Sequence, residues 1–387
     1  MTPGARVAAA IEILDTMRRG SAAEQALTRW ARTSRFAGSK DRAAVRDHVF
    51  DVLRRRRSAA ALGGGDTGRA LMIGALRQRG EDVSALFTGE GHAPAPLSDA
   101  EQPVGTPSLR KREQWNLPDW LLPEFERSLG EGAPATALEL QSRAPVTLRV
   151  NALKSSRDDA IARLATESIE AVPNPLSDTA LSLVDGARKL RNAAAYRDGI
   201  VELQDASSQA VVDLLPEGVQ ALDYCAGGGG KALALAAHGR RVRAHDIDSA
   251  RMQDLPARAD RAGVEITRCT AAELNRMTPF DLVLCDAPCS GSGAWRRAPE
   301  GKWTLTQDRL DRLCGLQDEV LDNAAPLVAP NGWLVYATCS VLRCENEERV
   351  TEFLRRNAGW HCTFQRRFDV TQHGDGFFTA HLTRVKL

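Results

Sequence analysis

Five apolar segments in the second half of the chain have the length and composition of buried β-strands. They are Val219–Tyr224, Val242–Asp246, Val264–Cys269, Phe280–Cys285 and Trp333–Thr338. Segments with helical spacing of apolar residues separate them, and such alternation is typical of a parallel, doubly wound sheet. We therefore predict an α/β fold with a Rossmann-like sheet over residues 206–387.

The first 87 residues have the pattern of packed amphipathic helices. Apolar residues recur at helical spacing in two stretches, first at Val7, Ile11 and Leu14 and then at Val45 and Val49. Residues 1–60 also carry thirteen Arg or Lys against six Asp or Glu, a local excess of +7. A basic helical surface attracts phosphates without reading sequence, although it can also be a merely solvated face. We predict an all-α domain over residues 1–87 that binds nucleic acid.

The composition changes twice before the predicted sheet. Residues 88–114 are rich in Gly, Pro and charged residues, as in Gly89–Pro96, which is typical of a linker. Residues 115–205 mix helical patterns with a strand at Val146–Val150, so we predict a small α+β domain there.

Composition narrows the class of protein further. The 387 residues are 43% apolar, which supports sizeable cores, and the net charge of +1 by itself indicates no particular partner. All eight cysteines lie between Cys225 and Cys362 without a Cys-x2-Cys pair, so we expect no metal site. Many free thiols, no export signal and no apolar run of the ~18 residues that a membrane span requires predict a cytoplasmic protein without membrane contact. We expect it to be a monomer.

Two cysteines stand where apolar strands end. Cys289 follows the strand Phe280–Cys285, and Cys339 directly follows Trp333–Thr338. Ligands of an open α/β sheet bind beyond the carboxyl ends of its strands, so both thiols are expected to face one site. A buried packing role is the usual one for a free cysteine, and we assign it to the other cysteines. The pairing of Cys289 with Cys339 instead predicts a two-thiol enzyme.

A glycine loop indicates a cofactor site. An apolar strand breaks into Gly227–Gly230, followed by Lys231 and an apolar helix. Glycines let backbone N–H groups approach a ligand, and a helix N-terminus favours negative charge. A nucleoside triphosphate loop is disfavoured, because Cys225 replaces its first glycine and Ala232 its hydroxyl residue. The carboxylate of Asp246, at the end of the next strand, suits the ribose of either a nicotinamide cofactor or S-adenosylmethionine.

Several further motifs occur together, in one order, over roughly residues 110–385. They are Arg149–Lys154, the glycine loop with Lys231, Asp286–Gly293, Thr338–Ser340, Glu345–Glu347 and Asp375–Ala380. With these motifs the sequence resembles the RNA cytosine-C5 methyltransferases of the Nop/Sun type. The Asp41–Arg46 segment is similar to the NusB-like domain of one bacterial branch, which modifies small-subunit ribosomal RNA. The resemblance implies a Rossmann-like methyltransferase sheet preceded by a small RNA-recognition-like domain and the helical domain.

The resemblance also implies roles for four side chains. The thiolate of Cys339 would add to cytosine C6, which makes C5 nucleophilic enough to take a methyl group. Cys289 would act as a base or assist release of the thiolate. Asp286 would hydrogen-bond the cytosine edge near N3 and N4, and Lys231 is the nearest cation that topology places beside the thiols.

S-adenosylmethionine is the cofactor that the resemblance implies. Its expected binding residues are Cys225, Ala226, Gly227, Gly228, Gly229, Gly230, Lys231, Asp246, Thr270 and Asp286. Two positions depart from the family pattern. The loop Cys-Ala-Gly-Gly-Gly-Gly-Lys replaces the usual Cys-Ala-Ala-Pro-Gly-Gly-Lys and should be looser, and Thr270 stands where an acidic side chain usually meets adenine.

The expected partner is RNA. The candidates for RNA contact are Arg149, Asn151, Arg296, Arg297, Lys302 and Trp303. Arg149 and Asn151 could equally support the catalytic domain, and Trp303 could equally fix its own loop. We expect 5-methylcytosine formation in small-subunit ribosomal RNA, with transfer RNA as the alternative substrate. A nicotinamide-dependent oxidoreductase has no use for paired thiols, and a non-catalytic RNA-binding protein would not need them intact.

Overall fold

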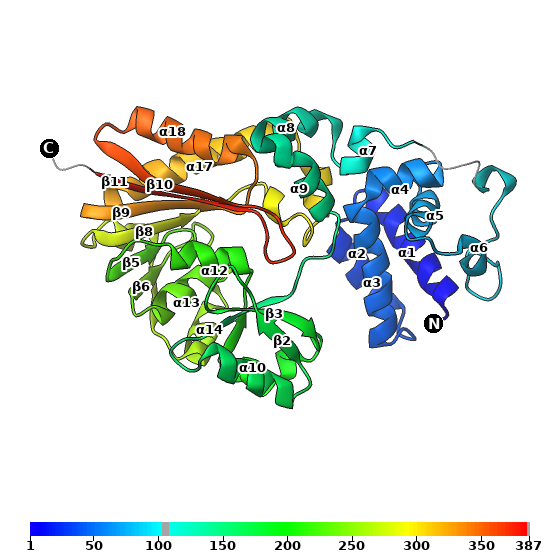
Figure 1. Cartoon of the computed structure of the whole chain (residues 1–387), viewed down its shortest axis with the longest axis horizontal. Helices are drawn as coiled ribbons and strands as arrows, with labels where there is room; N and C mark the ends of the chain where they lie inside the picture. Colours follow the sequence, from blue (N-terminus) through cyan, green and yellow to red (C-terminus); the bar gives the residue numbers. More distant parts are fainter. Residues whose placement is uncertain (103–107, 385–387) are drawn as a thin grey trace. The chain divides into compact units, whose positions relative to one another are not determined.

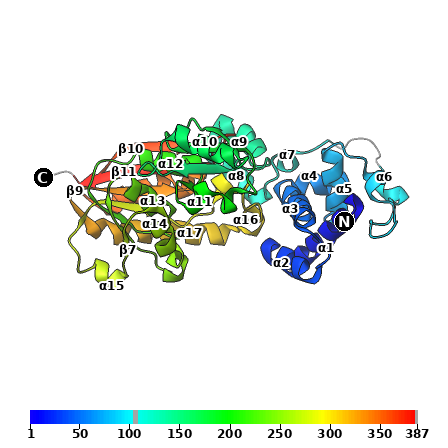
Figure 2. The ribbon, with the colours of Figure 1, turned by 90° about the horizontal axis from the view of Figure 1, so that it is seen from below.

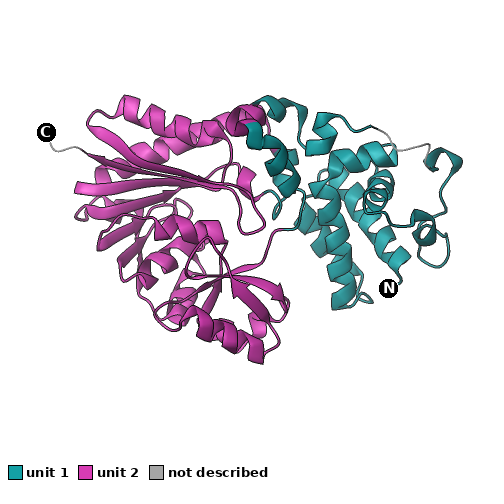
Figure 3. Ribbon diagram, viewed as in Figure 1, with its two compact units in different colours: residues 1–123, 131–143, 295–304 teal, residues 124–130, 144–294, 305–387 magenta. Residues whose placement is uncertain are grey.

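The computed structural model describes residues 1–102 and 108–384. Residues 103–107, which belong to the predicted linker, and residues 385–387 lie outside the described part. The chain forms two compact units, which Figure 3 shows in different colours. Unit 1 comprises Met1–Pro123, Glu131–Arg143 and Trp295–Thr304, and unit 2 comprises Glu124–Gly130, Ala144–Ala294 and Leu305–Leu387.

Unit 1 is helical, as its apolar pattern predicts. Its helices are α1 Pro3–Arg18, α2 Ala23–Thr33, α3 Ser39–Arg54, α4 Arg56–Gly63, α5 Gly68–Gln78, α6 Val83–Leu86, α7 Lys111–Trp115, α9 Ala133–Glu139 and α16 Glu300–Thr304. Apolar residues at helical spacing, such as Val7, Val45 and Val49, are at most 1% exposed and form one core. Thr2 begins α1 by accepting a hydrogen bond from the Ala5 amide, and Pro3 fits the first turn because it has no amide hydrogen to satisfy.

Two segments from later in the chain pack in unit 1. The side chain of Asn116 accepts the amide hydrogens of Arg57 and Ser58 at the start of α4. The Trp303 indole donates to the Leu53 carbonyl over 2.7 Å, and the Lys302 ammonium donates to the Arg54 carbonyl over 2.8 Å. The compact units therefore divide the chain differently from the predicted boundaries at residues 87 and 115.

The first part of unit 2 is a small α+β layer. Its elements are β1 Thr147–Val150, α10 Arg157–Thr166, β2 Glu170–Pro173, β3 Ala180–Asp185, α11 Ala194–Arg197 and β4 Val201–Leu203, with most of α8 Leu122–Leu129 also in the unit. The strands form an antiparallel sheet in the order β2-β3-β1-β4. The strand predicted at residues 146–150 is therefore confirmed.

The larger sheet of unit 2 has seven strands in the order β10-β11-β9-β8-β5-β6-β7 (Figure 1). The strands are β5 Gln220–Asp223, β6 Arg241–Ala244, β7 Ile266–Arg268, β8 Phe280–Asp286, β9 Val328–Thr338, β10 Trp360–Phe368 and β11 Phe377–Arg384. Strands β5 to β9 are parallel, which confirms the five predicted strands. The hairpin β10–β11 pairs antiparallel with β9 and was not predicted.

Helices cover both faces of this sheet (Figures 1 and 2). They are α12 Ala206–Asp213, α13 Gly230–Ala237, α14 Leu255–Ala262, α15 Ala271–Leu274, α17 Gln307–Ala324 and α18 Glu347–Arg356. Alternate residues of β8 enter two cores: Leu282 and Leu284 pack with α12 to α14, whereas Val283 and Cys285 pack with α17 and α18. This alternation is the doubly wound arrangement that the pattern predicts. No helix in the described part of the chain has both the length and the apolar character needed to cross a bilayer.

Candidate active site

Two neighbouring parallel strands bring the two predicted thiols together. Strand β8 ends at Asp286 and β9 ends at Thr338, with Asp286 opposite Ala337 in the register. The loops that follow place Cys289 Sγ 3.5 Å from Cys339 Sγ, and both side chains are partly exposed. The hydrogen bond to Cys339 and burial together raise the pKa of Cys289 well above its usual value. The shift favours the neutral thiol form of Cys289.

A buried cation lies beside this pair. Lys231, in the first turn of α13, donates from Nζ to Asp286 Oδ2 over 2.7 Å, and its ammonium group lies 5.1 Å from the centre of the Phe377 ring. Burial favours loss of its proton, but Asp286, Asp223 and Cys339 outweigh burial and raise the pKa of Lys231. The site therefore holds a fixed positive charge where a thiolate needs one.

Asp223 is a second carboxyl group in the same cluster. It ends β5 and is 1% exposed. Burial and the charge of Asp286 raise the pKa of Asp223 to about 7, although Lys231 and the Ala232 amide oppose the shift. The charge of the Lys231–Asp286–Asp223 group therefore changes near neutral pH. Asp223 was not among the predicted site residues, although its place at a strand end just before the glycine loop was a usable signal.

Glu345 connects the two thiol loops. Its buried carboxylate accepts hydrogen bonds from the amide and hydroxyl of Ser290 and from the hydroxyl of Ser340. Ser290 follows Cys289 and Ser340 follows Cys339 in the chain. The motif around Glu345 contributed to the family resemblance, but no role for this residue could be predicted from it.

The predicted cofactor loop lies at the end of β5. Asp246, two residues after β6, is 4% exposed and accepts hydrogen bonds from the Gly227 amide over 2.9 Å and from Arg251 over 3.1 Å. Gly229 begins α13 with a φ of +80°, and a Cβ there would lie 2.2 Å from Leu255 Cδ1. Only glycine fits this turn, because an L side chain would be strained as well as obstructed.

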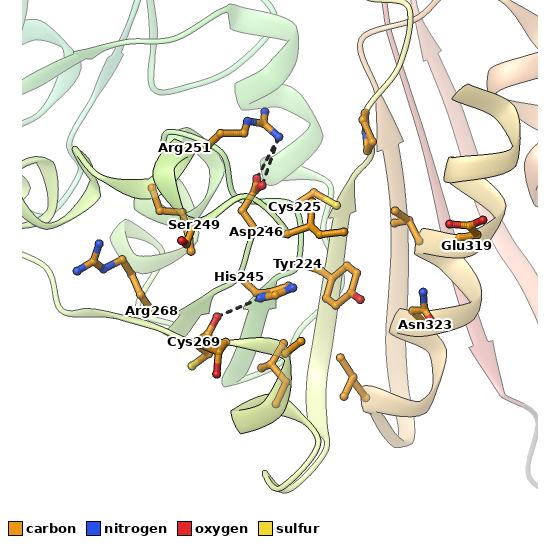
Figure 4. A pocket seen from close by; sticks show the side chains of 18 of the residues that line it. Tyr224, Cys225, His245, Asp246, Ser249, Arg251, Arg268, Cys269, Glu319 and Asn323 are labelled. Carbon is orange, nitrogen blue, oxygen red and sulfur yellow. Dashed lines mark hydrogen bonds and ion pairs between the residues drawn. The ribbon is translucent and has the colours of Figure 1, made fainter. Parts of the chain in front are cut away.

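A cavity of about 970 Å³ opens beside this loop (Figure 4). Tyr224, Cys225, His245 and Asp246 line it from the strand ends, and Glu319 and Asn323 face it from α17. Its volume lies at the upper end of the range for small-molecule sites. Cys225 and Asp246 therefore adjoin a space large enough for a nucleoside cofactor. Pro288, the residue before Cys289, also lines the cavity.

Thr270 lines the cavity, but its hydroxyl is already hydrogen-bonded to Glu273. Its hydroxyl accepts the Glu273 amide and donates to the Glu273 carboxylate, so it forms the N-terminal cap of α15. The described residues contain no group of three or more His, Cys, Asp and Glu side chains arranged to hold a metal ion.

Two predicted RNA-contact residues are inside unit 2. Arg149 is 5% exposed and donates to Gln204 Oε1 and to the Gly230 carbonyl, at 2.6 and 2.8 Å. Asn151 donates to the Gly199 and Ala262 carbonyls. Both side chains are buried and bonded within unit 2, which favours the alternative role of supporting the catalytic fold, and their contact with RNA stays a prediction.

Three of the four predicted RNA residues after the Pro-Cys motif, Arg296, Lys302 and Trp303, make contacts within unit 1. Arg296 and Lys302 are at most 1% exposed within unit 1, and Arg296 pairs with Glu139. Burial and the charge of Arg54 lower the pKa of Lys302 to about 7, which weakens it as a phosphate ligand. Trp303 fixes its loop through the bond to Leu53. Arg297 alone of these four is exposed. The sequence could not reveal this packing, because it depends on contacts with residues about 250 positions away.

The fold is a Rossmann-like sheet with a nucleoside-sized cavity at its strand ends, and comparison with known proteins identifies its class as methyltransferase. A methyltransferase homolog from Pyrococcus horikoshii has the same fold, with a TM-score of 0.60 and 24% identity, over 71% of this chain and 98% of that one. A family model described as 16S rRNA methyltransferase RsmB/F matches residues 211–383. A model of the ferredoxin-like domain of RsmF/B-like methyltransferases matches residues 117–188.

Curated relatives agree with the family models. The ribosomal RNA small subunit methyltransferase B of Xylella fastidiosa is 32% identical over 392 residues, which cover 89% of this chain and 90% of the relative. That of Photorhabdus laumondii is 32% identical over 284 residues, covering 69% of this chain and 66% of the relative. The chain belongs to the RsmB/F family of 16S rRNA methyltransferases, whose cofactor is S-adenosylmethionine. The nicotinamide alternative is thereby excluded.

Proposed function

We propose that this protein transfers a methyl group from S-adenosylmethionine to C5 of a cytosine in small-subunit ribosomal RNA. The observation that carries the proposal is the pair of thiols, Cys289 and Cys339, 3.5 Å apart beside the Lys231–Asp286 ion pair. A single thiol at a strand end is commonly a packing residue, but two thiols with a cation and a carboxylate make a reaction site.

Cys339 is the nucleophile in this proposal. Its thiolate adds to C6 of cytosine, and the electron pair of the C5–C6 double bond moves into the ring toward N3. Lys231 favours the thiolate by its charge, and the influence of Cys339 on the Lys231 pKa supports their proximity. Asp286 accepts a hydrogen bond from the cytosine amino group, and Lys231 holds that carboxylate in place.

S-adenosylmethionine supplies an electrophilic methyl group, which C5 of the activated ring takes. Asp246, which lines the 970 Å³ cavity and accepts the Gly227 amide, would hold its ribose, and the cavity is large enough for its adenine. Asp223, whose pKa is about 7, supplies a carboxyl group at the end of β5, just before the glycine loop.

Cys289 assists release of the product. After transfer, the C5 proton is lost to water, the C5–C6 double bond forms again, and the bond from Cys339 to C6 breaks. The departing sulfur takes up negative charge, and the neutral Cys289 thiol donates a hydrogen bond to it across 3.5 Å. The raised pKa of Cys289 supports this donor role because a thiolate could not donate.

The exterior of unit 1 supports an RNA substrate. Arg29, Arg32, Arg35 and Lys40 are exposed, and they form no ion pair with any residue between 1 and 102 or between 108 and 384. Phe36 lies among them with 76% of its surface exposed. Cations can bind phosphates, and an aromatic ring can stack on an unpaired base. We therefore assign RNA contact to this surface instead of the buried residues of the sequence prediction.

The test is methyl transfer with labelled S-adenosylmethionine to unmodified small-subunit ribosomal RNA and, separately, to transfer RNA. The expected result is label in 5-methylcytosine from ribosomal RNA. Label only in transfer RNA would overturn the substrate, label in another nucleoside would overturn the C5 chemistry, and absence of cofactor binding would overturn the whole proposal.

A further inference from the structure

Glu345 is an unusually placed carboxylate. It ends the short helix η8 (Arg343–Glu345), six residues after Cys339, and its side chain is fully buried. No cation pairs with it among the described residues. Instead it accepts the Ser290 amide at 2.7 Å, the Ser290 and Ser340 hydroxyls, and the Gln317 amide group at 3.1 Å.

These donors belong to both thiol loops. Ser290 adjoins Cys289, Ser340 adjoins Cys339, and Gln317 also donates to the Pro288 carbonyl over 3.0 Å. Glu345 is therefore a direct bridge between the two residues that follow the thiols. A buried carboxylate is tolerated only when its oxygens are well hydrogen-bonded, so loss of either loop from this arrangement would be costly.

The charge of Glu345 acts on one thiol more than the other. The groups that face Cys289 are Cys339 from the end of β9, Glu345 from η8 and Tyr336 from within β9. The Cys339 hydrogen bond and burial raise the pKa of Cys289 most, and the negative charge of Glu345 raises it further. The same carboxylate that fixes the loops thus helps to keep Cys289 protonated.

We propose that Glu345 is a positioning residue for both thiols: it sets their spacing and keeps Cys289 as the neutral partner of Cys339. This role rests on the proposed methyl transfer, in which one thiol attacks and the other assists release. Glu345 itself touches neither substrate nor cofactor.

The test is Glu345→Gln in the full-length protein. Gln is isosteric, and the serine hydroxyls can accept from its amide, so the fold should persist while the charge is lost. We expect kcat to fall about 10-fold with KM for S-adenosylmethionine almost unchanged, because a neutral amide replaces the charge-assisted hydrogen bonds to both thiol loops with weaker ones. We also expect the alkaline limb of the kcat–pH profile to move to lower pH, because Cys289 would lose its proton more readily.

The matched control is Glu348→Gln. Glu348 is three residues further along the chain and pairs with Arg127 at a partly exposed position. The Glu348→Gln variant should have the same kcat and the same pH profile as the wild type. If Glu345→Gln lowers thermal stability but leaves kcat and the alkaline limb as in the wild type, the residue is merely structural and the inference is overturned. Failure of the wild-type protein to methylate any RNA would instead overturn the proposed function.

A double-mutant cycle provides a second readout. Ser290→Ala and Ser340→Ala should have non-additive effects on kcat in the wild-type background, because both act through one carboxylate. The same two changes should become additive in a Glu345→Ala background, where no side chain joins the two serines. Additive effects in both backgrounds would contradict the bridge.

Discussion

Gly293 is the position where one added methyl group should disturb both thiol loops. Its amide donates to the Cys339 carbonyl over 2.9 Å, and its carbonyl accepts the Gly376 amide over 3.0 Å. A Cβ at Gly293 would lie 2.1 Å from the Gly376 carbonyl oxygen. Ordinary contact requires about 3.4 Å, so backbone must move by about 1 Å, and no flexible side chain can absorb the change.

The expected result of Gly293→Ala follows from that displacement. Overpacking costs about 1–3 kcal/mol, which for a unit of this size lowers Tm by several degrees. A shift of about 1 Å in the Cys289 loop should lower kcat about 100-fold. Methyl transfer under saturating substrates and a thermal melt measure the two effects.

Gly315→Ala is the matched control. Gly315 lies within α17, and no atom lies within 4 Å of a Cβ built there. It should stabilise the protein by about 0.5–1 kcal/mol, because alanine has the higher helix propensity, and leave kcat unchanged. Wild-type kcat and Tm in Gly293→Ala would refute the reasoning.

Three further predictions concern pH, the cofactor and RNA. The folded pKa of Asp223 is about 7, above its unfolded value, so folded Asp223 binds more protons than unfolded Asp223 between about pH 4 and 7. As the pH rises over that range, the free energy of unfolding of the wild type should therefore fall relative to that of Asp223→Asn, by up to about 4 kcal/mol in urea unfolding. Parallel stability curves for the two proteins would contradict the assignment. Arg149→Met should weaken S-adenosylhomocysteine binding about 10-fold in calorimetry, because it removes a charge-assisted hydrogen bond at the start of α13, and unchanged affinity with weaker RNA binding would restore the RNA-contact role. Replacement of Arg29, Arg32 and Arg35 by Gln should reduce the slope of log K against log salt by about 2–3 in RNA filter binding, and an unchanged slope would show that this surface is only solvated.

The sheet and the thiol pair were predictable because both depend on local patterns. Apolar runs marked β5 to β9, and the parallel order then required Cys289 and Cys339 to lie at one edge. The hairpin β10–β11 was missed although residues 360–365 alternate between apolar and polar, which is typical of an antiparallel strand with one covered face.

The environment of single charged residues was not predictable. The sequence shows that Arg149 and Lys302 are basic, but only the structure shows that each is buried and donates to a backbone carbonyl. Likewise, the pKa of Asp223 and the bridge made by Glu345 arise from contacts between distant segments. Residue type gave the possible chemistry, and burial decided which part of it each side chain can perform.

The most direct test of the two-thiol mechanism is to look for a covalent RNA–protein adduct that survives denaturing electrophoresis. Wild type, Cys289→Ala and Cys339→Ala are each incubated with labelled ribosomal RNA and S-adenosylmethionine. The account predicts that the adduct accumulates in Cys289→Ala, because release is impaired, and is absent in Cys339→Ala, because no bond to C6 can form. An adduct in Cys339→Ala and none in Cys289→Ala would contradict it by making Cys289 the nucleophile.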